Sequence, residues 1–485
     1  MTKFQPLSAF KQGGGDDYKL LPLRFTALDD DRYVLTNLAG EYHVSPKSVT
    51  HQFLSHQLSC DSAEYHALKS RHFLLDGDSS VALDLLALKT RTKLERLSNF
   101  TALHLFVVTL RCEHSCPYCQ VSRQNDNRTE FDMSPEIADR ALDLVFRSPS
   151  PNIKIEFQGG ESMLNFSMVR HIVEGALARN ATQKRNLGFV IATNLAVVTD
   201  EILAYCRKYG IHISTSLDGP ADLHNRNRPR PGDDSYRRAI DGMARVRHML
   251  GRDRVSAVMT TTAASLDRVR DIIDEYVSQD LRGIFLRPLS PYGFAMKTKW
   301  FAAYDREKWL EFYFEGLDYI IELNKQGVPF TEFYASTILT KMLTPFEPGY
   351  VDLTSPAGIG IGALVYNYDG RVYASDESRM LAEMGDDTFC LGTVNDPYEK
   401  LMLSNKLLDP IEQSIAASAP MCSDCAFEPY CGADPVYHHA TQGDFVGHKP
   451  SSDFCKRNMA IFRGLISRME ADPETRQLFL RWANR

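Results

Sequence analysis

The sequence has no apolar run near the roughly 18 residues that a membrane-spanning helix needs, and it has no low-complexity tract. Its first residues lack the apolar segment of a secretory signal peptide, so we expect a cytoplasmic protein with no membrane partner. The formal net charge of -7 does not suggest a basic surface for phosphate groups, so we expect no nucleic-acid partner. In the reducing cytoplasm, disulfide bonds are also not expected.

The 485 residues exceed one ordinary hydrophobic core, so two or three domains are expected. Residues 1–98 combine short alternating strands with two helical segments, which predicts a small α+β domain. Residues 99–330 alternate strand and helix. Residues 331–485 have many turns and few long periodic runs, and an amphipathic helix is predicted near their end.

Six short runs rich in Ile, Val, Leu and Phe are predicted to be buried parallel strands separated by amphipathic helices. This α/β pattern indicates a barrel or partial barrel, with its chemistry at the C-terminal ends of the strands. The predicted strands are Leu103–Leu110, Ile153–Gln158, Leu187–Ala192, Ile211–Leu217, Val255–Thr260 and Ile284–Pro288.

Ten cysteines are present, and seven of them fall into two spacing groups, which is typical of metal or redox sites in a reducing compartment. The first group, Cys112, Cys116 and Cys119, directly follows the first barrel strand with the spacing C-x3-C-x2-C. Three thiolates can bind three irons of a 4Fe–4S cluster and leave the fourth iron open to a substrate amine and carboxylate. A zinc site completed by His114 is the alternative.

This loop, with an aromatic residue before its last cysteine, resembles the signature of radical S-adenosylmethionine (SAM) enzymes. The resemblance covers residues 103 to about 295 and implies a partial (β/α)6 radical SAM barrel. It implies that Cys112, Cys116 and Cys119 bind the cluster and that Tyr118 lies near the adenine of S-adenosyl-L-methionine (AdoMet). Cluster and AdoMet together would then give a 5′-deoxyadenosyl radical that removes a hydrogen atom from the substrate.

Later motifs resemble the same family in order along the chain. The sequence Gly-Gly-Glu after the second strand resembles the motif that holds the methionine amine, and Ser-Leu-Asp-Gly-Pro follows the fourth strand. The serine and a later arginine of that stretch are implied to contact the carboxylate and ribose region. A leucine on the sixth strand is expected against the adenine or, alternatively, in the core. The implied cofactor contacts are Tyr118, Gly159, Gly160, Glu161, Asn194, Ser216, Arg228 and Leu286.

The second cysteine group has the spacing C-x2-C-x5-C-x23-C, a full set of four thiolates that could also bind zinc. It resembles the SPASM extension of radical SAM enzymes, which holds two auxiliary 4Fe–4S clusters. On this resemblance, Ser355, Ser375 and Pro435 stand where ligands of the inner cluster belong. One auxiliary 4Fe–4S cluster is therefore expected, bound by Cys422, Cys425, Cys431 and Cys455.

Proteins with this extension mostly modify ribosomally made peptides. The whole chain resembles maturases of the His-Xaa-Ser peptide system and cyclophane-forming enzymes, which implies side-chain crosslinking of a precursor peptide. The N-terminal domain resembles a winged-helix-like element that captures a precursor's leader by strand addition, and an oligomerisation or packing domain is the alternative. An electron donor such as flavodoxin or ferredoxin is the other expected partner.

Asp376 follows Ser375, at the position where sulfatase-maturing relatives carry a catalytic aspartate, and is a candidate general base. A solvated turn carboxylate is the alternative for this residue. Two other functions remain open: a radical SAM enzyme acting on a small molecule or cofactor precursor, and a non-catalytic iron- or zinc-binding module.

Overall fold

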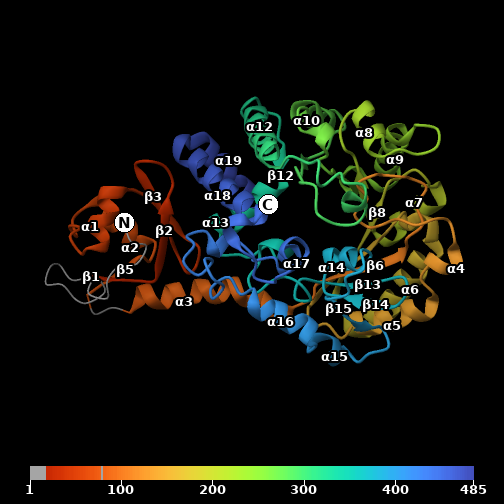
Figure 1. Ribbon diagram of the computed structural model, residues 1–485, viewed down its shortest axis with the longest axis horizontal. Coiled ribbons are helices and arrows are strands. Elements are labelled where there is room, and N and C mark those ends of the chain that lie inside the picture. The colour runs from red at the N-terminus through yellow and green to blue at the C-terminus, as the bar shows by residue number, and fades with distance from the viewer. Residues whose placement is uncertain (1–17, 78–79, 485) are drawn as a thin grey trace.

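The structure, a computed structural model, describes residues 18–77 and 80–484 (Figure 1). Residues 1–17 of the predicted N-terminal domain lie outside this part of the chain. In Figure 1 the N-terminal strands and helices form one end of an elongated molecule, and the strand–helix units form the other end. Most of the C-terminal helices lie between these ends. None of the described helices is long and apolar enough to cross a membrane.

The N-terminal end contains two small antiparallel sheets with two helices. One sheet has the order β2 (Leu23–Ala27), β3 (Arg32–Asn37) and β4 (Tyr42–Pro46). In the other, β1 (Tyr18–Leu20) pairs with β5 (Leu74–Asp76), and the helices are α1 (Lys47–Leu54) and α2 (Ala63–Ser70). These elements share a hydrophobic core of their own, made by Tyr18, Leu35, Phe53, Leu54, Leu58, Tyr65, Leu68, Phe73 and Leu74.

A long helix that the sequence analysis does not predict, α3 (Val81–Leu94), leads from this end toward the rest of the chain (Figure 1). Only Leu86 of this helix is buried, so the periodic apolar stripe of a core-facing helix is missing from it. A 3-10 turn, η2 (Glu95–Asn99), then connects it to the first strand of the large sheet.

The large sheet confirms the α/β organisation. Five parallel strands stand in the order β10 (Val255–Val258), β9 (His212–Ser216), β8 (Asn186–Thr193), β7 (Asn152–Gly159) and β6 (Leu103–Thr109). Helices separate successive strands: α4 (Arg128–Phe131), α5 (Pro135–Val145), α6 (Phe166–Gln183), α7 (Asp200–Tyr209), α8 (Ala221–Asn227), α9 (Ser235–Leu250) and α10 (Val269–Ser278).

The predicted sixth strand does not join this sheet. Of the predicted strand Ile284–Pro288, only Ile284 lies in a strand, β11 (Gly283–Ile284), which pairs in parallel with β12 (Thr331–Glu332) in a separate two-stranded sheet. The backbone N–H of Thr261, just beyond β10, donates to the carbonyl oxygen of Arg287. Pro288 has no N–H to donate, so the chain cannot extend this contact into a ladder there.

On its other edge the large sheet is extended by the C-terminal region. β13 (Ala363–Tyr366) lies parallel to β6, and β14 (Arg371–Tyr373) and β15 (Cys390–Thr393) follow in antiparallel order. The C-terminal region therefore contributes three strands to the sheet that the sequence analysis assigns to residues 99–330 alone. This continuity fixes the C-terminal region against the first barrel strand, which carries the first cysteine group.

The remaining helices pack around this sheet and beside the N-terminal end (Figure 1). The C-terminal helix predicted near residues 458–469 is present as part of a longer helix, α18. These helices are α11 (Phe294–Lys297), α12 (Arg306–Lys325), α13 (Phe333–Leu343), α14 (Asp376–Ala382), α15 (Tyr398–Met402), α16 (Asn405–Gln413), α17 (Pro435–Gln442), α18 (Asp453–Ala471) and α19 (Pro473–Ala483).

Candidate active site

The first cysteine group lies on an irregular loop at the C-terminal end of β6, as predicted. Cys112, Cys116 and Cys119 are each partly exposed, and burial of the thiol raises the pKa of Cys116 to about 12. The loop is anchored from outside: the N–H of Ser115 donates to the carbonyl of Pro229, and the N–H of Phe294 donates to the carbonyl of Cys119, both at 2.8 Å.

Arg111 holds the start of this loop. Its guanidinium is 2% exposed and donates to both carboxylate oxygens of Asp132, at 2.8 and 2.9 Å, and to Asp126 at 2.8 Å. This forked contact fixes the guanidinium plane, because the two donors match the spacing of the carboxylate oxygens. The loop that carries the cysteines therefore begins at a fixed point, the end of strand β6.

The glycines at the end of β7 allow the second strand to approach the cysteine loop. Gly159 has a φ of +140°, and a Cβ built on it would collide with the carbonyl oxygen of Thr109. A Cβ on Gly160 would collide with the carbonyl oxygens of Leu110 and Arg111. Only glycine fits at these two positions without moving backbone. The motif thus places Glu161 directly beside the loop.

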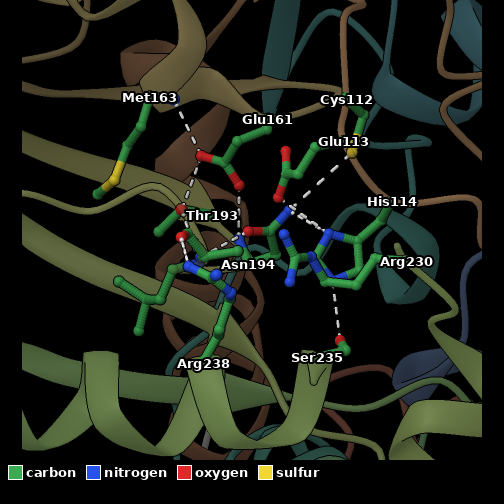
Figure 2. A network of polar contacts seen from close by, with 12 residues as sticks. Cys112, Glu113, His114, Glu161, Met163, Thr193, Asn194, Arg230, Ser235 and Arg238 are labelled. Carbon is green, nitrogen blue, oxygen red and sulfur yellow. Dashed lines mark hydrogen bonds and ion pairs between the residues drawn. The ribbon is translucent and has the colours of Figure 1, made fainter. Parts of the chain in front are cut away.

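Glu161 is fully buried and its carboxylate accepts three hydrogen bonds (Figure 2). The donors are the N–H of Met163 at 2.9 Å, the hydroxyl of Thr193 at 2.7 Å and the N–H of Asn194 at 2.7 Å. Burial, together with the charge of Glu113, raises the pKa of Glu161 to about 7. A buried carboxylate of this kind is stabilised by a nearby cation, such as the ammonium group of AdoMet.

Asn194 and His114 connect Glu161 to the cysteine loop (Figure 2). The amide nitrogen of Asn194 lies 3.0 Å from His114 Nδ1 and 4.0 Å from the sulfur of Cys112. Glu113 contacts the same histidine nitrogen at 2.9 Å, and its other carboxylate oxygen is buried with no hydrogen-bond partner in the described part of the chain. The sequence analysis does not predict a role for Glu113, because it is one of the variable residues between the first two cysteines of the C-x3-C-x2-C motif.

The ligand atoms of Cys112, Glu113 and His114 lie within 4.8 Å of one another, which is a different donor set from the zinc alternative of three cysteines and His114. Both ring nitrogens of His114 already have partners, because Nε2 lies 2.8 Å from the hydroxyl of Ser235. A zinc ligand would have to give up one of these contacts. The hydrogen bonds therefore favour a structural role for His114 and leave the three thiols as the metal-binding groups.

The fourth-strand motif forms a second polar network. The Tyr118 hydroxyl donates to Asp218 at 2.7 Å, and Arg228 makes a forked ion pair with the same carboxylate, with a shortest contact of 3.0 Å. The Arg228 guanidinium also lies 5.5 Å from the Tyr118 ring centroid. Although burial acts in the opposite direction, Arg228 holds the pKa of Asp218 below its usual value. Asp218 thus positions both Tyr118 and Arg228, which are predicted cofactor contacts.

Of the two remaining predicted cofactor contacts, Ser216 lies near the cysteine loop and Leu286 lies in the core. Ser216 ends β9 at the same edge of the sheet as the cysteine loop and is partly exposed. Leu286 is fully buried, and a Cβ on Gly316 of α12 would touch its side chain at 2.8 Å. Packing of this kind agrees with the alternative of a core leucine. The neighbours of Leu286 along the chain, Phe285 and Arg287, line a separate cavity.

The second cysteine group surrounds one cavity. Cys422, Cys425, Cys431 and Cys455 all line a space of about 300 Å³ between the C-terminal loops and the N-terminal strand β2. Burial raises the pKa of all four thiols, that of Cys422 to about 11. Four partly exposed cysteines around one cavity fit a metal centre with four thiolate ligands, either a 4Fe–4S cluster or zinc.

The three residues at the inner-cluster positions have other roles. Ser355 accepts from the N–H of Ala416 at 2.9 Å, and Ser375 caps α14 together with Ser378 in a reciprocal capping box. Pro435 is the first residue of α17. Cys390 lies at the start of β15, and its thiol is 3.7 Å from the carbonyl of Gly392.

Asp376 is the first residue of α14, directly after Ser375, whose capping box holds the start of this helix. Its side chain is 20% exposed, and one carboxylate oxygen is buried without a hydrogen-bond partner in the described chain. The closest cation is Arg379, 3.8 Å away. Burial raises the pKa of Asp376 to about 7, with Glu377 adding to this effect and Arg379 opposing it. This is not the environment of a solvated turn carboxylate.

Comparisons with known proteins agree with this site. Residues 106–279 match the model of the radical SAM superfamily. The radical SAM cyclopropyl synthase TigE of Paramaledivibacter caminithermalis is 23% identical over 150 residues, which cover 28% of this chain and 31% of TigE. The serine-type anaerobic sulfatase-maturating enzyme of Bacteroides thetaiotaomicron is 25% identical over 140 residues, 28% of this chain and 33% of the enzyme. The matches span about a third of these curated relatives.

Solved structures share the fold over more of the chain. The structure of anSMEcpe with bound AdoMet and Kp18Cys peptide has a TM-score of 0.63 at 17% identity, covering 79% of this chain and 99% of that chain. Streptococcus suis SuiB bound to precursor peptide SuiA has a TM-score of 0.50 at 14% identity, covering 90% of this chain and 100% of that chain. Residues 106–279 therefore match the radical SAM superfamily, and parts of the chain are similar in sequence to TigE and to the sulfatase-maturating enzyme.

Proposed function

We propose that this protein is a radical SAM maturase that crosslinks side chains of a ribosomally made peptide. The observation that carries the proposal is the convergence of the cysteine loop, Glu161 and Asn194 at the ends of β6, β7 and β8. The peptide substrate is supported by the likeness to SuiB and anSMEcpe, both solved with a peptide.

The residues present fit a 4Fe–4S cluster with AdoMet. Cys112, Cys116 and Cys119 would hold the cluster, and Glu161 would accept from the ammonium group of AdoMet. When bound, the two groups supply the 5′-deoxyadenosyl radical that removes a hydrogen atom from the substrate. Arg111 positions the cysteine loop, and Asn194 positions Glu161 relative to that loop.

The C-terminal cavity is proposed to hold one auxiliary 4Fe–4S cluster bound by its four cysteines. The hydrogen bond from Ala416 to Ser355, the capping role of Ser375 and the helical position of Pro435 support a single cluster. Asp376 is proposed as the general base that takes the proton released when a ring is crosslinked. The electron released in the same step would be accepted by an iron–sulfur cluster held by the cysteines. A pKa near 7 suits proton transfer at neutral pH.

The N-terminal domain is proposed to bind the leader of the precursor. In the described part of the chain β4 pairs only with β3, so it offers an edge to which an extended peptide could add a strand. The opposite edge strand, β2, instead faces the second cysteine group, where Phe25 and Thr26 line the cavity. Deletion of the whole domain would therefore also uncover that cavity.

The test uses anaerobically reconstituted full-length enzyme, AdoMet, a chemical reductant and the product of each short open reading frame next to the gene. Mass spectrometry should show a peptide that has lost two hydrogens, because joining two side chains removes one hydrogen from each. 5′-Deoxyadenosine should form together with this product. Formation of 5′-deoxyadenosine without change to any such peptide would favour a small-molecule substrate.

A further inference from the structure

A second buried cavity, of about 200 Å³, lies between the loop after β11, helix α12 and the C-terminal region. None of the residues assigned above to the cluster, AdoMet or the base lines it, although Glu377 is the direct neighbour of Asp376. Its wall includes Tyr292, Trp309, Asp352 and Asp434. The wall is formed by two stretches of the chain, residues 285–310 and 334–457, which follow the segment that matches the radical SAM model.

Four buried donors in this wall have no hydrogen-bond partner in the described chain: the hydroxyls of Tyr292 and Tyr304, the indole N–H of Trp309 and the Nε of Arg457. Tyr292 and Trp309 are each only 2% exposed. Buried donors without partners are destabilising and uncommon in native proteins. They indicate a ligand that brings hydrogen-bond acceptors, such as the carbonyl oxygens of a peptide.

Three carboxyl groups from three separate segments also face the cavity: Asp352, Glu377 and Asp434. Burial and mutual repulsion raise the pKa of Asp352 well above its usual range, and burial raises that of Asp434 to about 6. Glu307 and Asp453 also line the cavity, together with four cations, Arg287, Arg306, Lys456 and Arg457. Arg287 lies 3.8 Å from Glu377, and Arg306 pairs with Asp453. When all five carboxyl groups are ionised, they exceed the four cations by one negative charge.

An aromatic cluster forms the adjacent wall. The rings of Phe285 and Tyr334 stack with centroids 5.3 Å apart, and Tyr350 meets them edge-on at 6.1 and 6.0 Å. All three residues line the cavity. Aromatic faces attract cations, and they do so more strongly where water is excluded. Carboxylates beside aromatic rings therefore form a site suited to a positively charged group.

The size of the cavity limits the ligand. Its volume is below the roughly 300–1,000 Å³ of pockets for drug-sized molecules, so it suits one side chain rather than a whole cofactor. An outer cavity of about 440 Å³ shares Phe301, Arg306, Tyr437 and Asp453 with it. The inner ligand can therefore belong to a chain that continues outward, past the ion pair of Arg306 and Asp453 at 2.6 Å.

We propose that this cavity binds a cationic side chain of the peptide substrate, with its charge beside Asp352, Glu377 and Asp434 and its backbone carbonyls on Tyr292 and Trp309. The proposal rests on the proposed peptide substrate and deepens it, because it names the type of residue that the enzyme selects. Neither resemblance to relatives nor the cysteine motifs indicate this preference.

The test is an affinity selection from a random heptapeptide display library on reconstituted holoenzyme with AdoMet. Wild type should enrich Lys or Arg at one position by about tenfold or more over the starting library. The double variant Asp352→Asn/Glu377→Gln should lose this enrichment. The matched control is Asp267→Asn, an exposed carboxylate paired with Lys308, which should keep it. Iron content and the thermal unfolding transition verify that each variant is folded.

A second variant, Tyr292→Phe, keeps the ring and removes only the unpaired hydroxyl. It tests the proposal independently if the double variant fails to fold. It should weaken binding of the selected Lys- or Arg-containing peptide while its iron content stays at the wild-type value. No basic preference in wild type, or the same preference in every variant, would overturn the proposal. A variant-sensitive basic preference without any peptide modification would instead retain this site and remove the proposed crosslinking activity.

Discussion

The guanidinium of Arg24, on strand β2, lies 3.0 Å from the carboxylate of Glu428. Its Nε also donates to the carbonyl oxygen of Ser423 at 2.6 Å, so Arg24 binds residues before and after Cys425 in the chain. The Thr36 hydroxyl donates to the carbonyl of Ala426, at 2.6 Å, in the same loop. The N-terminal domain thus helps to hold the loop that carries three of the four C-terminal cysteines.

The first prediction concerns this contact. Replacing Arg24 with Gln leaves the buried carboxylate of Glu428 without its ion pair, which should destabilise the loop by about 1–3 kcal/mol. We expect faster release of iron to a chelator from the C-terminal site. The matched control is Arg32→Gln in the same domain, whose ion pair with Asp29 is exposed and should contribute only about 0–1 kcal/mol. Equal iron-release rates in the two variants would contradict the coupling.

The second prediction concerns the number of clusters. Anaerobically reconstituted enzyme should hold about 8 irons per chain, because two 4Fe–4S clusters are expected. The double variant Cys422→Ala/Cys455→Ala should hold about 4 irons and retain the cluster of the radical SAM domain. Iron analysis near 12 would mean that the roles of Ser355 and Ser375 are misread. About 4 irons with bound zinc in wild type would make the C-terminal centre a zinc site.

The third prediction concerns Glu161 and pH. Its pKa of about 7 means that the carboxyl group is partly protonated below neutral pH, and only the ionised form attracts an ammonium group. AdoMet affinity should therefore rise as the pH is raised from about 6 to about 8. In Glu161→Gln the affinity should fall roughly 10- to 100-fold and lose this pH dependence, since a charged hydrogen bond contributes about 1.5–3 kcal/mol.

The control for this prediction is Glu156→Gln, on the same strand β7. Glu156 accepts a hydrogen bond from Gln158 and makes none with the residues around Glu161 in the described chain, so AdoMet affinity and its pH profile should stay at the wild-type values. Equilibrium binding measurements on cluster-loaded enzyme give both quantities. An unchanged affinity in Glu161→Gln would show that another group binds the ammonium.

The fourth prediction concerns Asp376. The change to Asn keeps the shape of the side chain but removes its ability to accept a proton. The variant should still form 5′-deoxyadenosine and should lose crosslinked peptide, measured in the same reaction by chromatography and mass spectrometry. Product at the wild-type rate would place the base elsewhere, and Glu377, which lines the cavity beside it, would be the next residue to test.

Much of the radical SAM domain was predictable from local sequence, because buried parallel strands are short apolar runs and cysteine spacing is visible directly. Five of the six predicted barrel strands join the large sheet. The sixth could not be placed from its composition, since the sequence does not show that β11 pairs with β12. The helix α3 was missed because it lacks an amphipathic pattern.

The site was predictable where a motif marks it and not where tertiary packing builds it. The glycines before Glu161 are visible in sequence, and the structure gives their reason in the contact with the cysteine loop. The cavity of Asp352, Glu377 and Asp434 has no sequence signal, because its three carboxyl groups come from segments joined only by folding. The unpaired hydroxyl of Tyr292 is likewise a property of the folded chain.

The central claim is that the cysteine loop after β6 supports reductive cleavage of AdoMet. The direct measurement is 5′-deoxyadenosine formation by the reconstituted triple variant Cys112→Ala/Cys116→Ala/Cys119→Ala, with Cys206→Ala, a buried core thiol on α7, as the control. The account predicts no product above background in the triple variant, wild-type product in Cys206→Ala, and a preserved fold in both. Undiminished 5′-deoxyadenosine formation by the triple variant would contradict it.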